Sequence, residues 1–141
     1  MIFRKSRNFY WVLFAVGFAL NLVWELGQMQ YFTALSEIGY PRAVLFCTLA
    51  SVVDGVAVVS IFFVLENTAI PELGYYPFAA FFGGLTAVLF ELVATKLGLW
   101  AYAPDMPEIP FIKVGLLPFI QLLILVPASI FVTNISIERK K

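Results

Sequence analysis

The chain has 141 residues, of which 62% are hydrophobic, and its nine basic and nine acidic side chains give a formal net charge of zero. A neutral, strongly apolar chain lacks the basic surface that nucleic-acid binding needs, so no nucleic-acid partner is predicted. The single cysteine excludes an internal disulfide. The absence of histidine excludes haem ligation by histidine, most zinc sites and histidine-containing di-iron sites, and no cofactor is predicted.

Four apolar stretches are long enough to cross a bilayer as helices, at about 9–32, 43–65, 76–97 and 113–133. The connections between them are too short for a soluble domain. Residues 1–141 are therefore predicted to form a single membrane domain, an all-α four-helix bundle. No small-residue cleavage site follows the first stretch, so we expect it to be retained as a helix rather than removed as a signal peptide.

Basic residues gather at the two ends of the chain. Six of the nine lie there: Arg4, Lys5, Arg7, Arg139, Lys140 and Lys141. The other three, Arg42, Lys96 and Lys113, fall near the opposite side of the predicted bundle. Because basic residues are retained on the cytoplasmic side of a membrane, both termini are expected to be cytoplasmic.

Three carboxylates, Glu25, Asp54 and Glu91, lie inside stretches that are expected to be surrounded by lipid. An acid in the hydrocarbon core costs roughly 2.5–3.5 kcal/mol, so each is expected to face the bundle interior and to mark a functional site. Each also lies on a helix face of small or polar residues, which is typical of packing faces. With Gln121, the acids are predicted to meet in one layer about 10–16 Å below the outer helix ends. The faces contain Gly17, Asn21, Trp24 and Gln28; Cys47, Ser51 and Gly55; and Ala80, Gly84, Ala87 and Thr95.

Three buried carboxyls without matching cations cannot all be ionised, so at least one is expected to be a neutral acid near pH 7. Lys96 is the one cation near this layer, and its stem is long enough to reach outward to the interface. A neutral acid beside an ionised one suits acid–base chemistry on an apolar molecule, and it equally suits a proton-coupled carrier. The same oxygens, with that of Gln121, also suit Mg²⁺ or Ca²⁺, although no ligand-spacing motif is present.

Specific roles follow for the acid–base hypothesis. Glu25 and Glu91 are predicted to be proton donor and acceptor, and Asp54 is predicted to stabilise charge. Polar side chains on the same faces are predicted to bind or orient the substrate: Asn21, Trp24, Gln28 and Gln121. The alternative for the amides and for Ser51 is interhelical hydrogen bonding, worth about 0.6 kcal/mol each.

The connection Gly98–Ile112 contains Pro104, Pro107 and Pro110, which exclude a regular helix and predict a stiff outer cap. Trp100 and Tyr102 at its start have two interpretations. They are either interfacial anchors, as aromatic residues commonly are, or part of a lid over the acidic layer. In the second case both contact the substrate.

The segment Leu97–Leu123 resembles the repeat of membrane lycopene cyclases of the bacterial and fungal type. That family has a W-x-Y/F-x-P segment, a loop and then a Pro-x-Glu-Glu motif that enters the next helix. The matching residues here are Trp100, Tyr102, Pro104, Gly115 and Pro118. Ile120 and Gln121 stand where that family has its two glutamates.

The helix segment Trp24-Glu25-Leu26-Gly27-Gln28, followed by Tyr31 and Phe32, is similar to the acid-and-glutamine helix of sterol-isomerase and sigma-2-like membrane proteins. The whole chain also resembles small bacterial four-helix membrane proteins that share W-E-x-x-Q and G-x-W-x-Y. These resemblances imply a bacterial cytoplasmic membrane and an isoprenoid- or sterol-like ligand beside buried carboxyls.

The sequence therefore predicts a membrane protein with a buried, carboxylate-lined cavity that binds an isoprenoid-like lipid and cyclises or isomerises it by acid–base chemistry. The alternatives are a proton-coupled exporter, acting as a homodimer, and a non-catalytic accessory subunit of a larger membrane complex.

Overall fold

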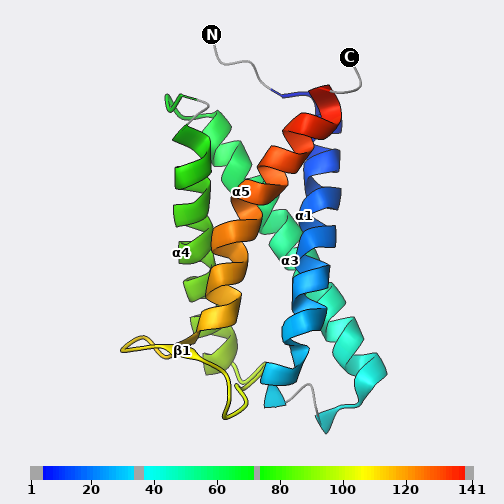
Figure 1. Ribbon diagram of the computed structural model, residues 1–141, viewed down its shortest axis with the longest axis vertical. Helices are drawn as coiled ribbons and strands as arrows, with labels where there is room; N and C mark the ends of the chain where they lie inside the picture. The colour runs from blue at the N-terminus through cyan, green and yellow to red at the C-terminus, as the bar shows by residue number, and fades with distance from the viewer. Residues whose placement is uncertain (1–4, 34–36, 72–73, 139–141) are drawn as a thin grey trace.

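The computed structural model describes residues 5–33, 37–71 and 74–138, and within them four long helices form the frame of the protein (Figure 1). They are α1 (Arg7–Gln28), α3 (Tyr40–Glu66), α4 (Tyr75–Lys96) and α5 (Leu116–Glu138). Each is long and apolar enough to span a membrane, so the chain is an integral membrane protein. The predicted all-α fold is confirmed. The side of the membrane on which the termini lie stays a prediction.

The helices run alternately up and down, so that the start of α1 and the end of α5 lie at one end of the bundle (Figure 1). We call this the terminal end. The opposite end, which we call the loop end, holds the end of α1, the start of α3 and the segment 97–115. α1 packs against α3 and α5, and α5 also packs against α4. Four of the basic residues used to predict orientation lie outside the described residues: Arg4, Arg139, Lys140 and Lys141.

Local signals set the first two helix starts. The Ser6 hydroxyl accepts a hydrogen bond from the backbone N–H of Phe9 at 3.3 Å, which caps α1 two residues before the predicted start. A 3₁₀ turn, η1 (Met29–Tyr31), follows α1 at the loop end. α3 begins at Tyr40 because Pro41 fits the first turn of a helix, where no backbone N–H is needed.

The predicted start of the fourth helix at residue 113 is wrong. Lys113 has a φ of 58° and Phe111 a φ of 73°, in the left-handed region, so the chain is not helical there. Instead β1 (Glu108–Ile109) pairs antiparallel with β2 (Val114–Gly115), and α5 begins only at Leu116. The prediction that this connection contains no regular helix is confirmed.

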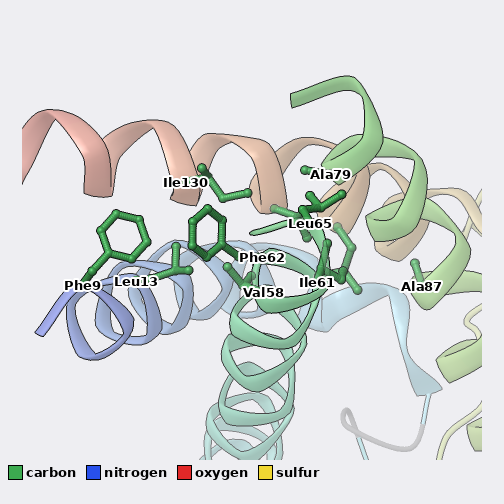
Figure 2. Packing of buried hydrophobic residues seen from close by; sticks show 11 residues of the cluster. Phe9, Leu13, Val58, Ile61, Phe62, Leu65, Ala79, Ala87 and Ile130 are labelled. Carbon is green, nitrogen blue, oxygen red and sulfur yellow. The ribbon is translucent and has the colours of Figure 1, made fainter. Parts of the chain in front are cut away.

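Apolar side chains fill the half of the bundle nearer the terminal end. Figure 2 shows Phe9, Leu13, Phe62 and Ile130 gathered between α1, α3 and α5. The rings of Phe9 and Phe62 lie 4.9 Å apart between centroids, and all four side chains are buried. Two small hydroxyl side chains of α5, Ser129 and Thr133, are buried in the same half, whereas the buried amides and the acids Asp54 and Glu91 lie nearer the loop end.

The packing face of α4 is close to the predicted one. Gly84, Ala87 and Glu91 are buried, whereas Ala80 and Thr95 are half-buried. The closest approach is at Gly83, which the predicted stripe omitted. A Cβ atom there would lie 2.3 Å from the backbone oxygen of Leu122 on α5, so only glycine allows α4 and α5 to come this near.

We expect Gly83→Ala to lower the free energy of unfolding by about 1–3 kcal/mol, because the two backbones must separate to admit the methyl group. Gly27→Ala is the matched control, since nothing lies within 4 Å of a Cβ at that helical position. It should raise stability by about 0.5–1 kcal/mol. Reversible unfolding of both variants in mixed micelles measures this, and equal effects would contradict the close approach.

Candidate functional site

Gln121 on α5 joins three helices through its side-chain amide. Its Nε2 donates to Glu25 Oε1 on α1 at 3.0 Å and to Asp54 Oδ2 on α3 at 3.0 Å. The same nitrogen lies 2.9 Å from Asn21 Oδ1. Because both carboxyl oxygens lie 3.0 Å from one nitrogen, they are within about 6 Å of each other, and the predicted convergence of Glu25 with Asp54 is present.

One face of α1 supplies the rest of this network. Gln28 Nε2 donates to Gln121 Oε1 at 2.8 Å and to Glu25 Oε1 at 3.0 Å, and Trp24 Nε1 donates to Gln28 Oε1 at 3.0 Å. Asn21 Nδ2 donates to the Gly17 carbonyl at 2.8 Å. These residues recur at three- and four-residue spacings, which places them on one side of a helix. We call Asn21, Trp24, Glu25, Gln28, Asp54 and Gln121 the polar network.

The network contains more acceptors than Gln121 has hydrogens to give. Its amide carries two N–H groups, yet three oxygens lie 2.9–3.0 Å from the nitrogen: those of Asn21, Glu25 and Asp54. The Gln28 amide is already occupied, since its two N–H groups point at Glu25 and Gln121. Because Glu25 Oε1 already accepts from Gln28, the four N–H groups of the two amides match four acceptor oxygens, those of Asn21, Glu25, Asp54 and Gln121.

The side chains of the polar network are mostly buried, and none of the described basic groups forms an ion pair with them. Asn21 is 0% exposed, Gln121 2% and Asp54 7%, whereas Glu25 is half-buried. Within the described residues, the one ion pair joins Lys113 and Glu108 at 3.9 Å on the exposed hairpin. Lys96, the cation expected nearest the acids, is exposed. No charge partner for the carboxyls is present among the described side chains.

Glu91 on α4 lies within electrostatic range of both other acids but has its own partners. The Tyr102 hydroxyl donates to Glu91 Oε2, and Trp100 Nε1 donates to the same oxygen at 3.2 Å. The Tyr102 oxygen in turn accepts from the backbone N–H of Gly115 at 3.0 Å. Burial, followed by the hydrogen bond to Glu91, raises the pKa of Tyr102, so the phenol keeps the proton that it donates.

The connection that carries these two aromatic residues is tied to the end of α1. Tyr102 and Phe32 form an antiparallel bridge, the Thr33 N–H donates to the Ala101 carbonyl at 3.0 Å, and the Ala103 N–H donates to the Tyr31 carbonyl at 2.8 Å. The Phe32 ring also contacts the Trp100 ring edge-on and the Tyr102 ring at a tilt. Of the two interpretations of Trp100 and Tyr102, these contacts favour the lid. The Trp100 N–H and the Tyr102 hydroxyl point toward Glu91.

We expect Tyr102→Phe to open this cap, because it removes the hydroxyl that joins Glu91 to Gly115. Loss of a buried hydrogen bond costs about 1–3 kcal/mol, so cleavage by an added protease within Asp105–Glu108 should become about ten times faster. Tyr40→Phe is the control, since Tyr40 is 71% exposed at the same end. Equal cleavage rates in the two variants would show that the hydroxyl does not hold the cap.

A third buried acid, besides Asp54 and Glu91, lies at the terminal end and was not predicted. Glu66, the last residue of α3, is 3% exposed and accepts hydrogen bonds from the Tyr10 hydroxyl and from the backbone N–H of Lys5. The predicted second helix, at about 43–65, ends one residue before it. Its spacing from Val58, Phe62 and Leu65, all buried, continues the core face of α3 and was the signal that could have identified it.

The other predicted residues have local partners. Ser51 Oγ donates to the Cys47 carbonyl at 2.7 Å within α3, and Cys47 Sγ lies 3.6 Å from the Glu25 carbonyl. Among the described residues, no group of three or more histidine, cysteine, aspartate or glutamate side chains is placed to hold a metal ion. The position between Glu25 and Asp54 is occupied by the N–H donors of Gln121. Substrate binding stays a prediction for all six side chains to which it was assigned: Asn21, Trp24, Gln28, Trp100, Tyr102 and Gln121.

Comparison of the chain with protein-family models, with curated proteins and with solved structures finds no match. The resemblances to lycopene cyclases and to sterol-isomerase-like proteins therefore stay predictions, and the candidate site rests on its own geometry.

Proposed function

We propose that this protein binds an isoprenoid-like lipid beside Glu25, Asp54 and Glu91 and isomerises or cyclises it by acid–base chemistry. The observation that carries the proposal is the pair formed by Glu25 and Asp54, held by one amide, with no basic side chain of the described residues bonded to either. A proton on one of the two carboxyls removes the repulsion between two charges in a medium of low dielectric.

The protonated acid of the pair would donate to one carbon of a C=C double bond. A C–H bond forms with the π electrons, and a carbocation is left on the neighbouring carbon. A carboxylate then removes a proton from an adjacent carbon, and the electrons of that C–H bond form a new double bond. Atoms and charges balance without a cofactor, and the product is an isomer. Attack by a second double bond before the proton is lost would instead close a ring.

Glu91 would serve as the second carboxylate of this chemistry. Two donors, from Trp100 and Tyr102, meet its Oε2 atom and favour its ionised form. An ionised acid is a proton acceptor and also stabilises a nearby cation. The indole rings of Trp24 and Trp100, which are anchored through their N–H groups, offer faces that attract a carbocation. The cap closes the loop end, which would keep water from the intermediate.

The ligand class follows from the surroundings of the acids. All three carboxyls lie on helices that are apolar enough to span a membrane, so a substrate reaches them from the bilayer rather than from water. An unsaturated hydrocarbon is the class of lipid on which a proton donor alone can act. The resemblance to small bacterial membrane proteins supports placing this activity in a bacterial cytoplasmic membrane.

The test begins with an organic extract of the purified protein. A stoichiometric isoprenoid in that extract, which takes up deuterium at carbon when the protein is incubated in D₂O, is the expected result, because the donated proton comes from solvent. Phospholipid alone, or a bound isoprenoid that gains no deuterium, would overturn the proposal. Substrate flux across vesicles driven by acid, without exchange at carbon, would identify the exporter instead.

A further inference from the structure

A cavity of about 310 Å³ opens at the terminal end of the bundle, away from the polar network. All four long helices or their flanks contribute to it: Lys5 precedes α1, Phe62 is on α3, Tyr75 and Tyr76 begin α4, and the end of α5 supplies the rest. The volume lies at the lower end of the range for ligand sites in proteins. The buried core between this cavity and the acids makes it a separate site.

The lining of the cavity changes from apolar to polar toward the helix ends. Its floor is apolar, because Phe62 and Ile130 are each 1% exposed and pack together in the cluster of Figure 2. Its wall is aromatic, since the Tyr76 ring contacts that of Phe131 at 6.3 Å. Polar side chains, from Lys5, Asn134 and Glu138, complete the lining near the helix ends.

The two charged groups of the lining have opposite signs and are not paired. Within the described residues, neither Lys5 nor Glu138 takes part in an ion pair. The Lys5 ammonium lies 5.2 Å from the centre of the Phe9 ring on α1, whereas Glu138 belongs to α5. An ammonium and a carboxylate that are held apart complement a ligand with both charges.

We propose that this cavity binds the headgroup region of a zwitterionic aminophospholipid. The phosphate would meet Lys5, the primary ammonium would meet Glu138 and the Asn134 amide oxygen, and the first carbons of one chain would rest on the exposed ring of Phe131. The location at the ends of membrane-spanning helices places the site at the depth where headgroups lie, which favours a membrane lipid over a soluble molecule of the same charge. The proposal is independent of the acid–base activity.

Native mass spectrometry of the detergent-solubilised full chain, titrated with phosphatidylethanolamine and phosphatidylglycerol of identical chains, measures this binding. Wild-type protein should retain phosphatidylethanolamine preferentially. Lys5→Gln and Glu138→Gln should each weaken its binding about tenfold, the effect of losing one charged hydrogen bond. Glu138→Gln should leave phosphatidylglycerol binding unchanged, because that lipid carries no ammonium.

Lys113→Gln and Glu108→Gln are the matched controls, since they remove the same groups from the exposed hairpin at the loop end. They should bind both lipids as the wild type does. Equal retention of the two lipids, or wild-type binding by both Lys5→Gln and Glu138→Gln, would overturn the proposal. So would equally tight binding of phosphoethanolamine without acyl chains, which would assign the site to a soluble molecule. All of these experiments measure lipid binding, so their outcomes do not depend on whether the protein is an enzyme.

Discussion

Glu25→Gln and Asp54→Asn are each expected to reduce deuterium incorporation into the bound isoprenoid by about 10²–10⁴-fold, the usual contribution of a positioned acid or base. The amides keep the shape of the acids and most of their hydrogen bonding, so the helices should still assemble. What is lost is the exchangeable proton between the two carboxyls.

Glu66→Gln is the matched control for this experiment. It makes the same change to a buried, hydrogen-bonded acid, but at the terminal end, where Tyr10 and Lys5 are its partners. Activity should remain within about threefold of the wild type, since no proton of the proposed reaction passes through it. Equal losses in all three variants would mean that the acids act on stability, and full activity in Glu25→Gln and Asp54→Asn would remove them from the mechanism.

Gln121→Leu is expected to be the most destabilising change in the polar network, by about 2–4 kcal/mol. It removes the amide donor of Asp54 and leaves Asn21 Oδ1 without its partner, whereas Glu25 keeps its bond from Gln28, and each buried group that loses its hydrogen bond costs about 1–3 kcal/mol. Unfolding in mixed micelles measures the loss.

Gln30→Leu provides the comparison, because Gln30 is an exposed glutamine in η1 at the same end of the bundle. Its effect should stay within about 0.5 kcal/mol, as is usual for surface positions. If Gln121→Leu were as mild as this control, the amide would not hold the three helices together.

Much of the fold followed from the sequence because hydrocarbon imposes simple rules. A run of about 20 apolar residues must be helical in a bilayer, and polar residues on it must face other helices. These rules predict inward-facing positions for Glu25, Asp54 and Gln121. They also gave the helix bounds to within a few residues, except where Lys113 and Phe111 adopt left-handed conformations that apolar character does not signal.

The partnerships within the site did not follow from the sequence. Glu25 was predicted to work with Glu91, yet its closest acid through hydrogen bonds is Asp54, because α5 inserts Gln121 between α1 and α3. Which side chain fills the space between two helices depends on helix rotation and crossing, and small residues such as Gly83 set these through contacts distant in the chain. The bonds from Trp100 and Tyr102 to Glu91 depend similarly on how a loop folds back.

Infrared spectroscopy of the carboxyl stretching band tests most directly whether Glu25 and Asp54 hold a proton between them. The purified protein at neutral pH should show the C=O band of a protonated carboxylic acid, and this band should shift in D₂O. The double variant Glu25→Gln/Asp54→Asn should lack it, whereas Glu66→Gln should retain it. A wild-type protein with only ionised carboxylate bands, or a band that survives in the double variant, would contradict a shared proton at this site.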